Sequence, residues 1–150
     1  MKFSLDEKSD VYTIRSYGPG YVEFSTPTHS DSEKAIELLK EGLGQDEGRQ
    51  KIRQSVIVLP NQLQEWSPAS FVELEEFHFQ SLLDLEAEIV LIGTGDHLRF
   101  PAPYLIEPLL RQQIGVEFMS TAAACRTYNI LVGEGRRVVA ALLMIRPPAP

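Results

Sequence analysis

One stretch, EIVLIGTGDHLRFP at residues 88–101, constrains the fold more than any other part of the chain. It opens with an apolar run from Ile89 to Gly93, and a run of this length bounded by turn residues predicts a strand buried on both faces. Gly93-Thr94-Gly95 then turns the chain into a polar, charged loop. In open α/β sheets, ligands bind at the carboxyl ends of strands. We therefore expect this stretch to be the middle of a sheet and the place of any site.

The flanking sequence predicts further strands and helices from its apolar periodicity and its turn residues. We expect a hairpin over 11–24 around Gly18-Pro19-Gly20, one long strand over 51–60, a loop over 61–68, and strands over 116–119 and 138–145. Helices are expected over 30–42, 76–84, 104–113 and 122–132, the third ending at Gly115 and the fourth capped by Ser120 or Thr121. Pro108 lies inside the third helix, so that helix either kinks or becomes regular only from Glu107.

The second half of the chain alternates strand, helix, strand, helix, strand, which predicts an α/β fold with parallel crossovers. The hairpin that precedes it predicts that the sheet is mixed. We expect one three-layer α/β domain over residues 11–145, with a mixed central β-sheet and flexible tails at 1–10 and 146–150.

The composition and net charge of the chain argue against several classes of function. The chain has 150 residues, a net charge of −7 and a hydrophobic fraction of 43%, which is typical of one globular domain. The negative charge and the lack of a basic stripe argue against nucleic-acid binding. No apolar run approaches the roughly 18 residues that a membrane helix needs. The single cysteine, Cys125, rules out an intramolecular disulfide, and the polar first residues do not resemble a signal peptide, so we expect a cytoplasmic protein.

Nucleotide, metal and nucleophile sites are weakly supported. Leu98 stands where a G-x-G-x-x-G motif needs its third glycine, and no phosphate-binding G-K-[S/T] follows. The three histidines are scattered, without the spacing of metal ligands. Cys125 is the only thiol, and a pair with His97 is conceivable, but a buried inert cysteine is the usual outcome. We expect no cofactor and no metal, and we lean against an enzyme.

The best candidate site is an anion site. Parallel crossovers would bring the loop after Gly93 to the same sheet edge as Thr121, at the start of a helix. The guanidiniums of Arg99 and Arg126, with free helix N–H groups, could then hold an anion. The alternative is that both arginines pair with local carboxylates such as Asp96. The candidate ligand residues are Gly93, Thr94, Gly95, Arg99, Thr121, Cys125, Arg126, Tyr128 and Asn129.

Several of these segments resemble one known family as a set. They are 91–95 (LIGTG), 99–101 (RFP), 115–117 (GVE) with Met119, Thr121 with 124–129 (ACRTYN), the 17–20 hairpin turn, the 55–60 strand and Trp66. Together they resemble the small Mth-type α/β domain family of unknown function, which includes a mitochondrial complex I assembly factor. The resemblance covers roughly residues 11–145; residues 25–48 look like an insertion, and Pro108 interrupts a helix that relatives run through.

The resemblance implies a three-layer domain with a mixed sheet, no established enzyme activity and no known cofactor. It also implies a role in assembling a respiratory complex through protein contacts. We therefore expect a non-enzymatic interaction or assembly-type protein with a protein partner. The alternative is a small-molecule or anion-binding protein, or an enzyme, with its site at the Gly93–Gly95 loop and the helix that carries Thr121 and Asn129.

Overall fold

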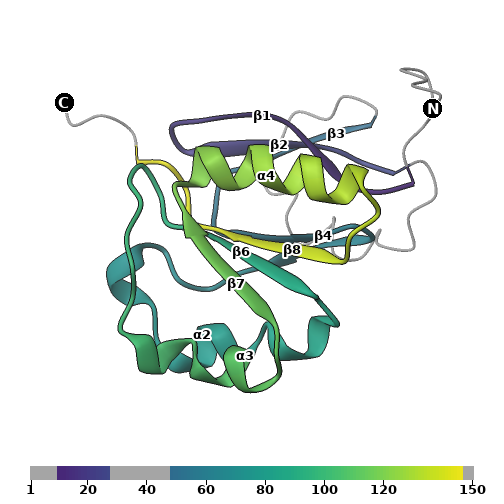
Figure 1. Cartoon of the computed structure of the whole chain (residues 1–150). Helices are drawn as coiled ribbons and strands as arrows, with labels where there is room; N and C mark the ends of the chain where they lie inside the picture. The colour runs from purple at the N-terminus through teal and green to yellow at the C-terminus, as the bar shows by residue number, and fades with distance from the viewer. Residues whose placement is uncertain (1–9, 28–47, 147–150) are drawn as a thin grey trace.

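The computed structural model describes residues 10–27 and 48–146, which form two β-sheets and the helices that cover them (Figure 1). The smaller sheet is antiparallel, in the order β1 (Thr13–Gly18), β2 (Tyr21–Ser25), β3 (Arg49–Ile52). The larger sheet is mixed and has five strands, in the order β5 (Gln62–Glu65), β4 (Val56–Leu59), β8 (Val138–Leu142), β6 (Ile89–Gly93), β7 (Gly115–Met119).

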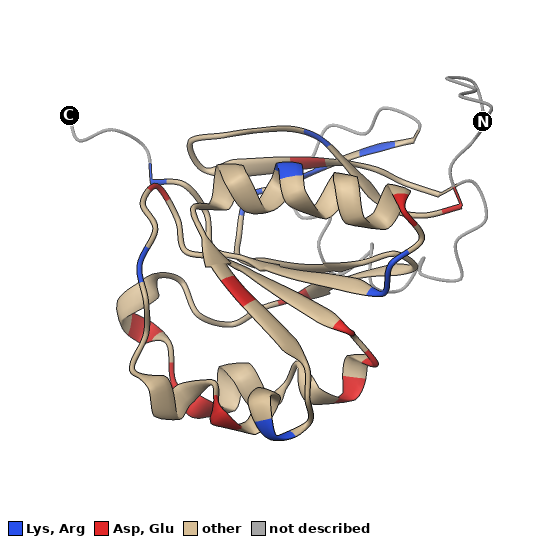
Figure 2. Cartoon of the chain, in the orientation of Figure 1, with Lys and Arg blue, Asp and Glu red and all other residues tan. Residues whose placement is uncertain are grey.

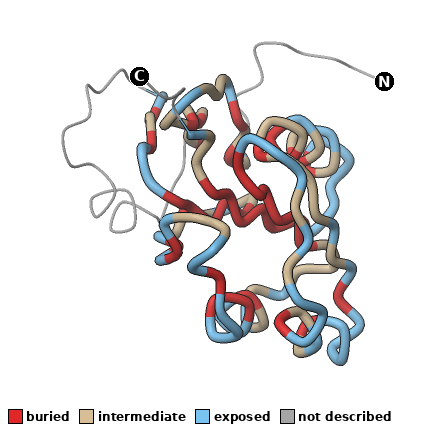
Figure 3. The backbone as a smooth tube through the Cα atoms, turned by 90° about the vertical axis from the view of Figure 1, so that its left-hand side faces the viewer, coloured by how far each residue is buried: buried red, intermediate tan, exposed pale blue. Residues whose placement is uncertain are grey.

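Three layers result, as the sequence predicted. The long helix α4 (Thr121–Gly133) and the small sheet lie on one face of the large sheet, and two short helices, α2 (Glu76–Gln80) and α3 (Glu107–Arg111), lie on the other (Figure 1). Two clusters of buried apolar side chains fill the spaces between the layers. Figure 3 shows the buried backbone concentrated along the large sheet, with exposed positions on the outer turns of the helices.

The middle strand is β8, not β6, which corrects the expectation for residues 88–101. β6 pairs in parallel with β8 on one side and with β7 on the other. Since β7 is the edge strand, β6 lies second from that edge. All five residues of β8 are buried, and its centre is Ala140-Ala141, small residues that let elements approach from both faces. The run from Ile89 to Gly93 is a strand with the predicted bounds, but burial on both faces does not distinguish the central strand from its neighbour.

The sheet is mixed for a different reason from the one we expected. The N-terminal hairpin forms as predicted, but it belongs to the small sheet. The large sheet is mixed because β4 runs antiparallel to β8, with Ile57 opposite Ala141.

The predicted strand over 51–60 and the predicted loop after it are both wrong. β3 and β4 belong to different sheets, and the chain leaves one for the other at residues 53–55, where Ser55 donates a hydrogen bond to the Pro68 carbonyl (2.5 Å). Pro60 and Asn61 then make a two-residue turn, and residues 62–65 return as β5 rather than as a loop. Strand propensity marks both segments as extended, but it cannot assign them to a sheet.

The short helices differ from the prediction mainly at their ends. Residues 71–73, left open by the sequence, form the 3₁₀ turn η1 (Phe71–Glu73), and the predicted helix over 76–84 divides into α2 and the 3₁₀ turn η2 (Leu83–Leu85). The 3₁₀ turn η3 (Pro103–Leu105) precedes α3, and the regular helix begins at Glu107. This confirms one of the two alternatives given for Pro108, a helix that becomes regular only from Glu107. Gln113, not Gly115, takes the left-handed position after α3, with φ of 59°.

Helix α4 follows the prediction closely. The Ser120 hydroxyl accepts a hydrogen bond from the Ala123 N–H and caps it. The predicted helix over 30–42, most of the predicted insertion and all of the two tails except Asp10 and Arg146 lie outside the described residues.

Candidate functional site

The first candidate site is the turn after β6, which the structure does bring against the start of α4. The Gly95 N–H donates to the Thr121 hydroxyl (2.9 Å), and that hydroxyl donates to the Leu143 carbonyl (2.6 Å). A Cβ on Gly93 would lie 2.9 Å from the Thr121 hydroxyl oxygen and 3.1 Å from the Thr121 Cα, so only glycine fits there without movement of the helix. This turn therefore joins two strands and a helix tightly.

The backbone donors of this loop are largely used inside the protein. The Thr94 N–H donates to the Met119 carbonyl (2.9 Å), and the Arg99 N–H donates to the Thr94 hydroxyl (3.2 Å). At the start of α4, the Thr121 N–H donates to the Gly95 carbonyl (2.8 Å). An anion at this place would consequently depend on arginine side chains.

The two arginines of the predicted anion site are placed differently. Arg99 lies with its guanidinium 5.7 Å from the centre of the Phe71 ring, and it lines a cavity of about 30 Å³ together with Thr94, Gly95 and Arg146. Arg126 lies on the exposed side of α4, where it donates to the Tyr17 hydroxyl on β1 (2.6 Å), and it does not line that cavity. Arg146, which the sequence placed in a tail, is the arginine that lines the cavity beside Arg99.

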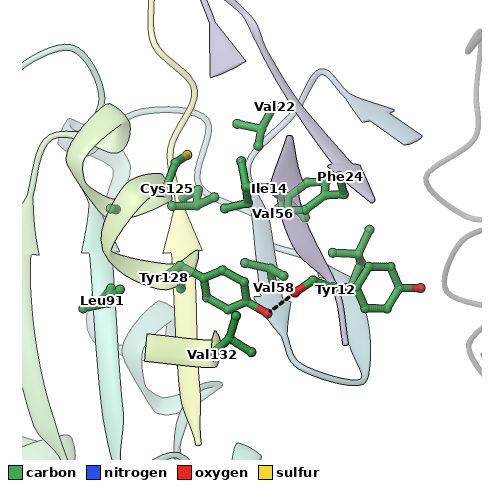
Figure 4. Close-up of a cluster of buried hydrophobic side chains, with 14 of the residues drawn as sticks. Tyr12, Ile14, Val22, Phe24, Val56, Val58, Leu91, Cys125, Tyr128 and Val132 are labelled. Atoms are coloured by element: carbon green, nitrogen blue, oxygen red, sulfur yellow. Dashed lines mark hydrogen bonds between the residues drawn. The ribbon is translucent and has the colours of Figure 1, made fainter. Parts of the chain in front are cut away.

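Cys125 lies in the core, shielded from solvent. Its side chain is 1% exposed among the apolar residues between α4 and the two sheets (Figure 4). Burial raises the pKa of the thiol to about 12, and the neighbouring Arg126 charge offsets only part of that effect. His97, its conceivable partner, is exposed and lies 3.5 Å from the Asp96 carboxylate.

Tyr128 and Asn129, two other candidate ligand residues, bind the backbone of the hairpin. The Tyr128 hydroxyl donates to the Tyr12 carbonyl (2.9 Å; Figure 4). The Asn129 amide makes two bonds to Ile14, accepting from its N–H and donating to its carbonyl, both at 2.8 Å. These two side chains therefore hold β1 against α4.

A larger cavity, of about 630 Å³, is lined in part by the segment that the sequence predicted to be a loop, and no site was predicted there. Its walls come from the chain before β4, the chain after β5, helix α2 and Met144. Trp66 and His78 line it, both nearly buried, and the Trp66 indole N–H donates to the His78 carbonyl (3.2 Å). The only signal in the sequence was that the chain's one tryptophan lies in the predicted loop.

The helical layer, taken as η1, α2, η3 and α3 with the loop over 94–102 that leads into them, has an acidic surface with exposed apolar side chains. Six of the seven most exposed large apolar side chains of the described residues fall within residues 71–111; they are Val72, Phe77, Leu98, Phe100, Tyr104 and Leu110, and the seventh is Ile130 on α4. The same segment contains eight acidic residues and two basic ones, a net charge of −6 out of the chain's −7. Figure 2 shows red positions along these lower helices and strand ends.

The described residues, 10–27 and 48–146, contain neither a metal-binding cluster nor a membrane-spanning helix. No group of three or more histidine, cysteine or carboxylate side chains there is arranged to hold a metal ion. No helix of the described part is long and apolar enough to cross a membrane.

Comparison with known proteins gives a consistent family. A model of the family described as proteins of unknown function, DUF498/DUF598, matches residues 14–143. The chain is 36% identical over 93 residues to the bovine NADH dehydrogenase (ubiquinone) 1 alpha subcomplex assembly factor 3, covering 61% of this chain and 50% of that one. This chain thus spans about half the length of the curated relatives it matches.

Solved structures share the fold over nearly the whole chain. A crystal structure from Bordetella parapertussis is 30% identical with a TM-score of 0.69, covering 89% of this chain and 96% of that one. A solution structure from Bordetella pertussis, described as an Mth938-like domain, is 26% identical with a TM-score of 0.69 and covers 97% and 94%.

Proposed function

The chain belongs to the DUF498/DUF598 family, and from its named relatives and its acidic, apolar helical layer we infer that it is a non-enzymatic, assembly-type protein that binds a protein partner. The observation that carries this proposal is the concentration of exposed apolar side chains and carboxylates between residues 71 and 111. Exposed apolar residues that lie together on a monomer are typical of protein-binding surfaces. The excess of carboxylates favours a partner with a basic segment.

The relatives support the same class of function. Several are named as assembly factors of NADH dehydrogenase (ubiquinone), which implies contact with subunits of a membrane complex. For this chain we propose an assembly role of that general type. We also propose that the protein is cytoplasmic, because a single cysteine fits a reducing compartment. Fractionation of native host cells tests this location.

The test compares partners of three forms of the tagged chain expressed in its native host. The variant Phe100→Ser with Tyr104→Ser removes two exposed rings of the helical layer, 71% and 62% exposed. The matched control is Ile130→Ser on the opposite layer, also 62% exposed. We expect a partner identified by quantitative mass spectrometry with the wild type and the control to fall about tenfold or more with the double variant, as loss of two central aromatic contacts predicts.

Salt dependence adds a second readout. Binding to a basic segment must weaken as salt is raised, since exposed charges are screened over about 10 Å at 0.1 M ionic strength. Equal recovery of the same partners by all three forms would reject the helical layer as the surface. Turnover of a small substrate, with no partner recovered, would reject the proposed function as a whole.

A small anion at the turn after β6 is the second candidate function. The observation in its favour is that Arg99 and Arg146 line one small cavity with Thr94. Titration of ¹⁵N-labelled protein with inorganic phosphate tests it. The geometry predicts amide shifts near Thr94 that Arg99→Gln abolishes and Arg126→Gln leaves intact; no shift at tens of millimolar phosphate removes this candidate.

A further inference from the structure

The cavity of about 630 Å³ lies beside α2, and Phe77, one of the exposed side chains of the helical layer, is part of its lining. Its volume lies within the range of about 300–1,000 Å³ that small-molecule sites occupy. Its walls are held by internal hydrogen bonds: Ser55 donates to the Pro68 carbonyl (2.5 Å), and Ser81 donates to the His78 carbonyl (2.8 Å). The walls are therefore fixed before any ligand arrives.

His78 supplies a hydrogen-bond donor to this cavity. The imidazole is only 5% exposed, and its Nδ1 accepts a hydrogen bond from the Glu75 N–H (2.9 Å) as part of the capping box of α2. Since Nδ1 is the acceptor, the neutral ring carries its proton on Nε2. Nε2 bonds to no other described residue and is not itself buried, so it is open to a ligand in the cavity that His78 lines.

Burial also keeps this histidine neutral. It lowers the pKa of His78, and the nearby carboxylates of Glu75 and Glu73 oppose the shift without cancelling it. The ring therefore offers the cavity one N–H donor and no positive charge at neutral pH.

Arg53 supplies the positive charge. Arg53 lines the same cavity, and its guanidinium makes no hydrogen bond or ion pair with another described residue. The one carboxylate at the cavity, Glu65, accepts a hydrogen bond from the Gln54 side chain (2.8 Å). An uncommitted guanidinium and an N–H donor on residues that line one cavity are suited to a carboxylate, whose two oxygens accept several hydrogen bonds.

The rest of the lining combines Gln54 and three serines with apolar and aromatic side chains. The Trp66 and His78 rings meet edge to face, with 6.4 Å between their centres, and the centres of the Phe77 and His78 rings are 4.0 Å apart. Pro68, Ala69 and Met144 complete the apolar surface. A ligand that places its acidic group at Arg53 and His78 would set an apolar or aromatic body against Trp66.

We propose that this cavity binds the carboxylate of a small organic acid with an apolar body, through Arg53 and the Nε2–H of His78. The same chemistry occurs in a free acid and in the C-terminal residue of a peptide. The proposal does not rest on the assembly function, since the helical-layer variants leave Arg53 and His78 in place.

Trp66 is the chain's only tryptophan and lines the cavity, so its fluorescence reports binding directly. We would titrate the protein with 3-phenylpropionate, with its neutral amide and with phenethylamine, exciting the tryptophan selectively. We expect the acid to change the emission saturably and to bind about tenfold or more tightly than the amide, because a charge-assisted hydrogen bond is lost in the amide. An acetylated tripeptide ending in phenylalanine is titrated in the same way, as the free acid and as the C-terminal amide. Tighter binding of the peptide acid than of 3-phenylpropionate indicates that the ligand is a peptide C-terminus, and the reverse order indicates a free organic acid.

Two arginine variants make the test specific. Arg53→Gln should raise the dissociation constant for the acid about tenfold, whereas Arg49→Gln, another exposed arginine but outside the cavity, should leave it unchanged. His78→Gln retains an acceptor for the Glu75 N–H and should weaken binding while α2 stays folded, as circular dichroism will show. Equal binding of acid and amide, no saturable change in Trp66 emission, or an unchanged constant in Arg53→Gln would overturn the proposal.

Discussion

Replacing Asn129 should loosen the hairpin from α4, by an amount that the structure allows to be estimated. β1 is an edge strand of the small sheet, and the amide of Asn129 bonds to the Ile14 N–H and carbonyl as a neighbouring strand would. Each bond contributes about 1 kcal/mol net, so Asn129→Ala should cost about 2 kcal/mol. Alanine is the better helix former by about 0.6 kcal/mol, which reduces the expected loss of unfolding free energy to about 1.5 kcal/mol.

The assay is urea unfolding followed by circular dichroism, with hydrogen exchange at the Ile14 amide as the local measurement. Asn129→Asp is the matched control, because it retains the oxygen that accepts from Ile14 N–H but loses the donor to the carbonyl. The Ile14 amide should therefore exchange fast in Asn129→Ala and stay partly protected in Asn129→Asp. A stability change below about 0.5 kcal/mol in Asn129→Ala, with Ile14 protection intact, would show that these bonds do not hold the hairpin.

Three further outcomes follow from the buried groups. Gly93→Ala should lower the unfolding free energy by about 1–3 kcal/mol in a urea titration, because its Cβ would approach the Thr121 backbone to 3.1 Å; unchanged stability would contradict the tight turn. Cys125 should react with iodoacetamide at pH 8 only in denaturant, since burial raises its thiol pKa to about 12, and rapid labelling of the native protein would show the core to be open. The pKa of His78 is lowered in the folded state, so the unfolded chain binds a proton more readily than the folded one. The free energy of unfolding should therefore fall as the pH drops from 7 towards and through the folded-state pKa. The His78→Gln variant should lack this part of the pH dependence, and identical pH profiles of the variant and the wild type would refute the prediction.

The elements that could be predicted from the sequence are those whose signal is local. The bounds of β6 and α4, the turn of the β1–β2 hairpin and the cap at Ser120 all follow from apolar runs, periodicity and turn residues within about 15 positions. Even the start of α3 at Glu107 was one of two local alternatives for Pro108.

Sheet membership could not be predicted, because it depends on pairing across long separations in the sequence. β4 pairs with β8, with Val56 opposite Leu142. No residue near Val56 in the sequence indicates that β8 is the neighbouring strand. The same reason explains why residues 51–60 were expected to form one strand. The large cavity was missed similarly, since its walls come from segments around Arg53, Trp66, His78 and Met144.

The candidate site was predicted in part, and the residues it joins indicate where function must be sought. Gly93 and Thr121 do meet, yet Thr121, Tyr128 and Asn129 use their side chains to hold strands and helix together. Most of the residues that carried the resemblance to the family therefore have structural roles. For this reason they predicted the fold, and they do not indicate a ligand. A partner or a substrate must instead be recognised by side chains that the framework leaves uncommitted. In this chain those are the exposed rings of the acidic helical layer and the Arg53–His78 cavity, and the variants proposed for each leave the other unchanged.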